Sequence, residues 1–426
     1  MSMIHRRSFL ASSFGGLAAA LSYGPALFGQ DDFTPEVETA LPERERFAPA
    51  SLFLTWRKDP TATMLVQWVG PEVKEDTAIH YVPLDGEIWQ RTRTVTKPFP
   101  NTDLKVYRCE LTGLKAGTEY FFQIGKTSPV YRFRTMPAKA SDTFQFVSGG
   151  DSGIGSHAVA SNINAARQEP YFALIAGDLA YDNGRSPKTF LTFLENYSHS
   201  MVDPKGRLIP MLACVGNHEV AGGYRGKREG APQYLSVFDG LYSEATYGVM
   251  DIGDYLSLVL LDTGHIAPIE GEQTDWLGKT LAERQDRPHL IVANHVPAYP
   301  SVRNPQGPDG KFGTGEGNRL HWSPLFEKYN VDVVLEHHDH AFKRTHPLTD
   351  GLKNKYGVVY LGDGSWGKIR APKKPENRPY LAAVSEAYHV TVHRLEGDQR
   401  FHVALEESGR VADVCTTIGK RPARRG

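Results

Sequence analysis

The chain has few cysteines for its length. Its 426 residues include only Cys109, Cys214 and Cys415, an odd number with no C-x-x-C spacing. The fold therefore does not rest on a disulfide framework. Cys214 lies in the apolar run 208–215 and is expected to be a buried thiol, whereas the sequence leaves a Cys109–Cys415 disulfide open.

The chain also lacks an excess of charge of either sign, because its formal net charge is -1. This balance gives no general electrostatic reason to bind nucleic acid or an anionic membrane surface. We therefore predict no nucleic-acid partner. The basic residues near the chain end are interpreted as a solvated tail over 416–426.

A strongly apolar run of about 20 residues, as a transmembrane helix needs, is missing as well. Residues 9–28 are uncharged but rich in Ala, Gly and Ser, and they follow Arg6 and Arg7 in a twin-arginine-like motif. We expect a cleaved signal peptide over 1–29 and no stable membrane insertion after its removal. The expected location is periplasmic or extracellular, after export by the twin-arginine pathway.

The rest of the chain, after the predicted signal peptide, divides into two regions that differ in the spacing of their apolar residues. After a polar linker over 30–48, residues 49–137 hold short alternating runs rich in β-branched and aromatic residues, which is typical of a small β-sandwich. The runs are 52–56, 64–69, 78–82, 107–111 and 120–124. Residues 138–415 alternate apolar runs with helix-like stretches such as 158–167 and 275–284. This second pattern predicts a layered α/β domain.

Five short motifs follow apolar runs of the second region. In order they are Gly150-Asp151-Ser152-Gly153, Gly177-Asp178-Leu179-Ala180-Tyr181, Gly216-Asn217-His218-Glu219, Asn294-His295 and His337-His338-Asp339-His340. Tens of residues separate successive motifs, so only the fold can bring them together. Because ligands bind beyond the carboxyl ends of strands in open α/β sheets, we expect the motifs to meet at one sheet edge.

The residue types in these motifs suit a pair of metal ions. Two cations about 3.5–4 Å apart can clamp the attacking and leaving oxygens of an in-line displacement at phosphorus. Because the cations repel each other, a carboxylate is needed between them, and imidazole nitrogens suit transition metals. The candidate ligands are Asp151, Asp178, Tyr181, Asn217, His295, His338 and His340. The set predicts a two-metal phosphoester hydrolase.

As a set, the motifs resemble those of the metallophosphoesterase superfamily and, more narrowly, of purple acid phosphatases. The first motif has Ser152-Gly153 where the superfamily usually has a histidine, and the second has the Gly-Asp-x-x-Tyr form of the purple branch. The resemblance extends to Leu54-Thr55-Trp56 and Leu111-Thr112-Gly113-Leu114. It implies an α/β catalytic domain of the calcineurin-like type, a layered β-sandwich flanked by helices, behind an all-β fibronectin-type sandwich.

The resemblance also implies the metals and their ligands. Fe(III) would be held by Asp151, Asp178, Tyr181 and His340. A second, divalent metal (Fe, Zn or Mn) would be held by Asp178, Asn217, His295 and His338, with Asp178 bridging. The phenolate of Tyr181 would replace the lost imidazole and favour ferric iron.

Two histidines are candidate catalytic groups. His218 matches the family histidine that contacts phosphate or protonates the leaving group. His337 stands where the family usually has glycine, and it is interpreted either as a substrate contact or as a mere neighbour of the ligands. Glu219 is expected to orient a ligand rather than to react, and Lys343 stands where the family often has glutamate.

The resulting prediction is an exported dinuclear-metal phosphatase of the acid phosphatase type. It would hydrolyse phosphomonoesters to orthophosphate by attack of a metal-bound hydroxide, and its partner would be a phosphorylated small molecule. Two alternatives stay open. One is a phosphodiesterase or nucleotide hydrolase on the same metals, and the other is a non-catalytic exported protein that binds metal or glycan.

Overall fold

The computed structural model describes residues 47–139, 144–239, 245–307 and 313–419. The predicted signal peptide, nearly all of the predicted linker and the basic residues of the predicted tail lie outside these ranges. Within the described part of the chain, no helix combines the length and apolar character needed to cross a bilayer.

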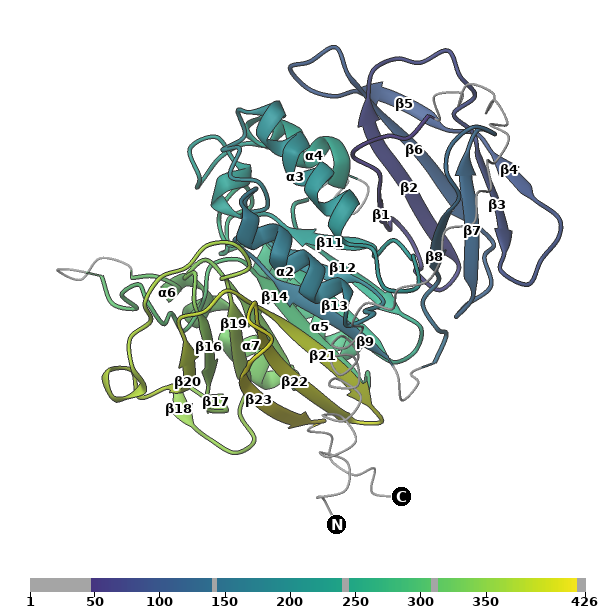
Figure 1. Cartoon of the computed structure of the whole chain (residues 1–426). Helices are drawn as coiled ribbons and strands as arrows, with labels where there is room; N and C mark the ends of the chain where they lie inside the picture. The colour runs from purple at the N-terminus through teal and green to yellow at the C-terminus, as the bar shows by residue number, and fades with distance from the viewer. Residues whose placement is uncertain (1–46, 140–143, 240–244, 308–312, 420–426) are drawn as a thin grey trace, which may run out of the picture. The chain divides into compact units, whose positions relative to one another are not determined.

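Residues 53–134 form the predicted β-sandwich from two antiparallel four-stranded sheets (Figure 1). One sheet runs β1 (Phe53–Thr55), β2 (Thr63–Gly70), β6 (Lys105–Thr112) and β5 (Val95–Pro98). The other runs β4 (Gln90–Thr92), β3 (Ile79–Pro83), β7 (Glu119–Ile124) and β8 (Tyr131–Arg134). Burial alternates along β7, as expected for a strand with one face in the core. Each of the five apolar runs expected here overlaps a strand.

A six-stranded sheet forms one half of the catalytic region. Its order is β11 (Met211–Cys214), β10 (Ala173–Ala176), β9 (Gln145–Gly149), β21 (His389–Glu396), β22 (Gln399–Glu406) and β23 (Val411–Ile418). Strands β9, β10 and β11 are parallel, whereas β21, β22 and β23 pair antiparallel. Strand β23 continues to Ile418, so the predicted domain end at residue 415 falls inside it. Cys109, Cys214 and Cys415 are all free thiols, so the disulfide that the sequence left open is not formed.

A seven-stranded sheet forms the other half. Its order is β12 (Gly248–Ile252), β13 (Leu256–Leu261), β14 (His289–Asn294), β15 (Val333–Glu336), β19 (Val359–Asp363), β16 (Phe342–Thr345) and β20 (Leu381–Ser385). The four strands from β13 to β19 in this order are parallel. A hairpin of β17 (Leu348–Thr349) and β18 (Leu352–Lys353) follows β16. Strand β19 packs against β9 and β21, so the two sheets face each other.

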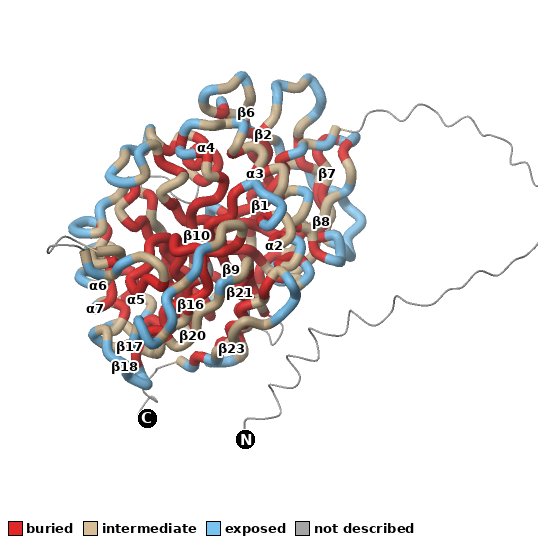
Figure 2. Tube along the Cα trace, turned by 60° about the vertical axis from the view of Figure 1, so that its left-hand side comes forward, coloured by how far each residue is buried: buried red, intermediate tan, exposed pale blue. Residues whose placement is uncertain are grey.

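Helices cover the outer faces of this layered structure. Helices α2 (Ser156–Ala166) and α3 (Pro187–Ser200) pair with each other, and α2 packs against β21 (Figure 1). Helices α5 (Glu272–Arg284), α6 (Glu316–His321) and α7 (Ser323–Lys328) belong to the seven-stranded half. There Leu277, Leu281, Trp322 and Phe326 pack with strand residues in one buried cluster. Figure 2 shows the buried trace running through β9 and β10.

Hydrogen bonds and ion pairs join the sandwich to helix α4 (Pro232–Phe238) and to Asp239, which follows it. The Arg108 guanidinium donates to the Ser236 carbonyl over 2.8 Å and pairs with Asp239 at 2.5 Å. Lys97 also reaches Asp239, at 2.5 Å. Burial would raise the pKa of Asp239, but the hydrogen bonds from Arg108 and Lys97 hold it below its usual range. Cations of the sandwich therefore hold the end of a helix of the catalytic region.

Candidate metal centre

The five motifs lie directly beyond parallel strands, but these strands belong to two sheets. The first three motifs follow β9, β10 and β11 of the six-stranded sheet, and the last two follow β14 and β15 of the seven-stranded sheet (Figure 1). The expectation of a single sheet edge is therefore wrong in this detail. Because the sheets face each other, their strand ends meet in one place.

Four of the predicted ligands form a tight buried cluster. One ligand atom each from Asp151, Asp178, His295 and His338 lies within 4.8 Å of all the others. Nε2 of His295 is 3.3 Å from Oδ2 of Asp178 and 3.1 Å from Nδ1 of His338. Oδ1 of Asn217 lies 3.2 Å from the same His295 nitrogen. The atoms of the predicted divalent site therefore converge.

The atoms of the predicted ferric site meet beside this cluster. The Tyr181 hydroxyl is 3.3 Å from Oδ1 of Asp151 and 3.1 Å from Nε2 of His340. Nε2 of His340 is in turn 3.0 Å from Oδ1 of Asp151. All seven predicted ligands thus lie in one connected group, in which Asp151 links Tyr181 and His340 to the tight cluster.

One atom tests whether this site fits metal ions. Oδ2 of Asp178 is buried, and among the described residues no group makes a well-aligned hydrogen bond to it, although Nε2 of His295 lies 3.3 Å away. Its Oδ1 accepts from the backbone N–H of His218 at 2.8 Å. A buried carboxylate oxygen without a partner is costly. Imidazole nitrogens, carboxylates and an amide oxygen around it are a donor set for transition metals. The residues therefore fit a metal pair with Asp178 between its members.

The site also fixes which ring nitrogens are available. Nδ1 of His295 lies 3.0 Å from the Ala176 carbonyl oxygen, so it donates there and leaves Nε2 for the cluster. Such a backbone partner is the usual means of orienting a ligand histidine. Gly177 is required beside it, since a Cβ there would lie 2.4 Å from Nδ1 of His295.

Neighbouring charges change the pKa values of two proposed ligands. Burial lowers the pKa of His295, but the Asp178 and Asp151 carboxylates outweigh it and raise that pKa to about 9. Burial and the Asp151 carboxylate raise the pKa of Tyr181 above its ordinary value. A phenolate at this position therefore requires a cation to compensate it.

Five of the seven predicted ligands have left-handed backbone conformations. Their φ angles are 58° at Asp151, 55° at Asp178, 63° at Tyr181, 71° at His338 and 60° at His340. This conformation costs a non-glycine residue roughly 1–2 kcal/mol. Such strain persists only where the surrounding structure imposes it, and it gathers at functional sites. The strand ends turn sharply to aim these side chains at one point.

Glu219 supports the second and third motifs without facing the cluster. Its buried carboxylate accepts backbone hydrogen bonds from Gly216 at 2.7 Å, Asp178 at 2.8 Å and Leu179 at 2.7 Å. These bonds hold the turn that carries Asp178 against the turn that carries Asn217. This placement agrees with the interpretation of Glu219 as an orienting group.

The two candidate catalytic histidines lie in different surroundings. The His218 side chain is 33% exposed, and its Nε2 is 3.9 Å from Oδ2 of Asp178. His337 is 1% exposed, lies under Gly150, and places Nδ1 3.0 Å from the Asn294 carbonyl oxygen. The position of His337 favours a role in joining two strand ends over a contact with substrate.

Sequence reasoning missed two residues beside His218. Asn183 places its Oδ1 2.5 Å from Nδ1 of His218, so this ring nitrogen donates and Nε2 faces the cluster. Tyr224 places its hydroxyl 3.3 Å from Nε2 of His338. Asn183 follows the second motif by two residues, which was a usable signal. Tyr224 lies in a glycine-rich segment with no recognisable pattern.

A pocket of 470 Å³ adjoins the cluster. Its volume is in the range of small-molecule sites. Its lining includes Asn217, His218 and Tyr224, together with Asp182, whose pKa is raised to about 7 by burial. The arrangement thus places an open space beside the exposed histidine and the predicted metal ligands.

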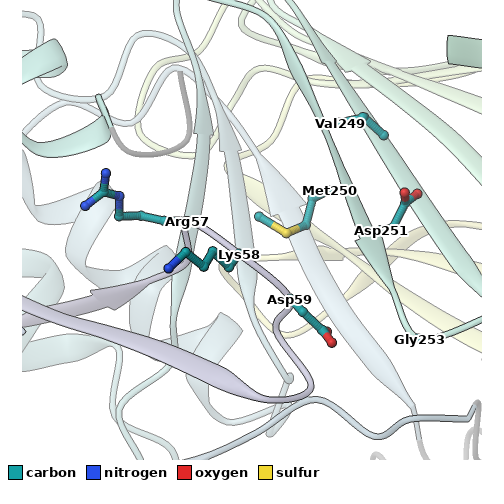
Figure 3. Close-up of a pocket in the computed structure, with 7 residues that line it drawn as sticks. All are labelled: Arg57, Lys58, Asp59, Val249, Met250, Asp251 and Gly253. Carbon is teal, nitrogen blue, oxygen red and sulfur yellow. The ribbon is translucent and has the colours of Figure 1, made fainter. Parts of the chain in front are cut away.

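A second pocket, of 370 Å³, lies where the sandwich meets β12. Figure 3 shows Arg57 and Lys58 on one side and Asp251 on the other. The Asp251 carboxylate is already bound by Ser257 at 2.6 Å and by Arg284 at 3.0 Å. None of its lining residues belongs to the five motifs, so we assign the chemistry to the cluster.

Comparison with known proteins identifies both regions of the chain. The family model described as calcineurin-like phosphoesterase matches residues 144–342, and the purple acid phosphatase N-terminal domain matches residues 49–135. Purple acid phosphatase 15 of Arabidopsis thaliana is 25% identical over 61% of this chain and 53% of its own length. Acid phosphatase type 7 of Mus musculus is 23% identical over 89% of this chain and 93% of its own length.

A solved structure supports the fold. The purple acid phosphatase PPD1 from seeds of yellow lupin (Lupinus luteus) superposes with a TM-score of 0.70 at 20% identity, over 87% of this chain and 74% of the lupin chain. The chain spans only about half the length of the Arabidopsis relative. It contains a calcineurin-like phosphoesterase domain, preceded by a purple acid phosphatase N-terminal domain.

Proposed function

We propose that the chain is a dinuclear-metal phosphatase that hydrolyses phosphomonoesters to orthophosphate. The observation that carries this proposal is the buried cluster in which ligand atoms of Asp151, Asp178, His295 and His338 lie within 4.8 Å of one another. Asn217, Tyr181 and His340 contact members of this cluster. Neither a structural ion pair nor a packing cluster needs this combination of buried acceptors. An open pocket beside it can hold a substrate.

The proposed ligands divide between two metals. Asp151, Tyr181 and His340 would hold Fe(III), and Asn217, His295 and His338 would hold a divalent ion, with Asp178 shared. When bound, such a pair activates water and neutralises charge on the phosphoryl oxygens. The divalent ion is Fe, Zn or Mn, since the donor set accepts each of them.

His218 is the residue that we propose donates a proton to the leaving group of the substrate. Asn183 fixes the ring so that Nε2 points toward the cluster, and the side chain is the exposed histidine there. A proton given by Nε2 to the departing alcohol oxygen would assist its release. Such general acid assistance is typically worth about 10²–10⁴-fold.

The first experiment joins metal analysis to visible spectroscopy. The protein is loaded with iron and a second metal, and Tyr181→Phe is prepared alongside it. A broad band in the green-to-yellow region that disappears in Tyr181→Phe would support the ferric tyrosinate centre. Zinc or manganese in both sites without this band would leave a metallophosphoesterase but remove the ferric assignment.

Activity on matched substrates tests the reaction itself. We expect the loaded protein to release orthophosphate from phenyl phosphate far faster than it cleaves diphenyl phosphate. Asp178→Asn should abolish activity and metal binding together. The reverse substrate order would make it a phosphodiesterase on the same metals. No cleavage of either ester by fully loaded protein would favour a non-catalytic binding role.

His218 can be tested without disturbing the ligands. His218→Gln should retain both metals and lower kcat by about 10²–10⁴-fold on an alkyl phosphate. The loss should be smaller on 4-nitrophenyl phosphate, because its leaving group needs no proton. Equal losses on both substrates would argue that His218 binds phosphate instead.

We further propose that the chain is exported, with Arg6 and Arg7 as the recognised pair. This rests on the sequence motif alone. A double Arg6→Lys/Arg7→Lys variant should accumulate inside the cell, whereas the unaltered chain should appear outside the cytoplasm. Equal export of both would exclude the twin-arginine route.

A further inference from the structure

Tyr224 stands at the mouth of the metal centre on a segment that the proposed mechanism does not use. It lies between the third motif and α4, and it lines the 470 Å³ pocket together with Asn217 and His218. Tyr224 is 47% exposed, although His265 and His338, whose rings it contacts, are buried. A large aromatic surface is therefore presented to whatever occupies the pocket.

The segment around Tyr224 is held in place by the segment around His265. The Gly223 carbonyl oxygen lies 2.9 Å from Nδ1 of His265, and the Gly226 N–H donates to the His265 carbonyl at 2.7 Å. The Arg225 N–H donates to the Gly264 carbonyl at 2.9 Å. The Tyr224 ring packs on the His265 ring at a centroid distance of 4.8 Å. Tyr224 is thus exposed and fixed in position at once.

The hydroxyl of Tyr224 contacts the outer nitrogen of a proposed ligand. Nδ1 of His338 faces His295, and its Nε2 lies 3.3 Å from the Tyr224 hydroxyl. If Nδ1 ligates, Nε2 carries the proton and donates it to the phenol oxygen. Ligand histidines generally need such a partner to keep their orientation.

We propose that Tyr224 is a specificity-determining residue, whose ring stacks on the alcohol part of the substrate while its hydroxyl positions His338. The preferred substrates are then phosphomonoesters of planar, aromatic alcohols. This inference rests on the proposed function, since it places the phosphoryl group at the metals. Stacking of aromatic rings should favour a planar group over a saturated one by about 3- to 10-fold in affinity.

Binding of inert analogues tests the ring without relying on turnover. Benzylphosphonate and cyclohexylmethylphosphonate differ only in whether their six-membered ring is planar and aromatic, and neither is hydrolysed. Titration calorimetry on the metal-loaded protein should give benzylphosphonate a dissociation constant about 3- to 10-fold lower. Tyr224→Phe should keep this preference, because the ring remains. Tyr224→Leu should abolish it.

The role of the Tyr224 hydroxyl is tested separately, by how firmly the protein holds the divalent metal against a chelator. Tyr224→Phe should lose the divalent metal to a chelator at about 10-fold lower chelator concentration, as expected when a partner of a ligand histidine is removed. Tyr356→Leu, which alters an exposed tyrosine outside the motifs, should change neither measurement.

The outcomes separate this inference from the proposed function. A preference for benzylphosphonate that persists in Tyr224→Leu, or is absent in the unaltered protein, would overturn the role of the ring. Unchanged chelator resistance in Tyr224→Phe would overturn the role of the hydroxyl. Loaded protein that binds benzylphosphonate with the expected preference but cleaves no phosphomonoester would refute the phosphatase proposal and retain the role of Tyr224.

Discussion

The ammonium group of Lys343 donates to the carboxylate of Glu336 across 2.5 Å, in the protein interior. Lys343 also donates to the Tyr299 carbonyl at 2.6 Å, and the other Glu336 oxygen accepts from the Ala298 N–H at 2.6 Å. Glu336 ends β15, two residues before His338. Lys343, which stands where the family often has glutamate, is therefore one partner of a buried ion pair beside the last motif.

Breaking this pair should be costly. Lys343→Met would leave the Glu336 carboxylate buried without its cation, and removing one partner of a buried pair costs about 3–5 kcal/mol. Urea unfolding of the metal-free protein at pH 7 would measure this loss. The double variant Lys343→Met/Glu336→Gln should recover much of it. A double variant as unstable as Lys343→Met alone would show that the pairing is not the cause.

Glu219 should control metal affinity. In Glu219→Gln the amide can accept fewer of the three backbone hydrogen bonds, because one of its two polar atoms is a donor. The turns that carry Asp178 and Asn217 should then separate, and metal affinity should fall by about 10–100-fold. Competition with a chelator of known affinity measures this change in metal affinity. Glu229→Gln, an exposed change in the following segment, should bind metal normally.

The left-handed backbone at His340 should be visible in stability. In the metal-free protein we expect His340→Gly to be about 1 kcal/mol more stable than His340→Ala, because glycine adopts a φ of 60° without the Cβ clash. Asn217 offers the matched control, since its φ is not positive. There the alanine variant should be the more stable one. The denaturant midpoints of the glycine and alanine variants at His340 and Asn217 measure these stability differences.

The buried His402 should make the protein sensitive to acid. Nδ1 of His402 lies 2.7 Å from Nδ1 of His393, and Nε2 lies 3.0 Å from the Thr417 hydroxyl. Burial has the largest effect and lowers the pKa of His402 well below its ordinary 6.5, and the electrostatic effect of nearby arginine and histidine side chains lowers it further. These groups are His393, Arg400, Arg344 and His289.

The direction in which stability changes with pH follows from the lowered pKa of His402 in the folded state. Above about pH 6.5 both states leave His402 neutral and stability is unaffected. Below it the unfolded chain takes up a proton first, so stability falls by up to about 1.4 kcal/mol per pH unit from this group. Metal-free His402→Gln should show a shallower loss between pH 6.5 and 5 than the unaltered protein. His199→Gln, at an exposed site, should follow the unaltered curve.

The sequence predicted the parts of this molecule that local pattern determines. Alternation identified five strands of the sandwich, and apolar runs identified strands of the catalytic region. The motifs after these runs supplied the seven proposed ligands, which the structure brings close together, because a strand end places the following residue at a sheet edge. The two-domain fold of the metallophosphoesterase type was confirmed.

What escaped prediction depends on contacts between distant segments. The expected single sheet edge became two, since β15 pairs with β14 and β19 rather than with β9, β10 or β11. The Lys343–Glu336 pair and the Tyr224–His338 contact join segments with no shared periodicity. The left-handed turns at five proposed ligands are uncommon for any residue with a Cβ, so propensity could not reveal them.

The attachment of the sandwich to α4 has a consequence for the molecule as a whole. Helix α4 begins where the glycine-rich segment with Tyr224 ends, and Gln67, Lys97 and Arg108 bind residues 236–239 at its far end. A catalytic region expressed alone would expose these partners and loosen the wall of its own pocket. We therefore expect the two domains to unfold together, and a change of sequence on one side of this contact to affect the other.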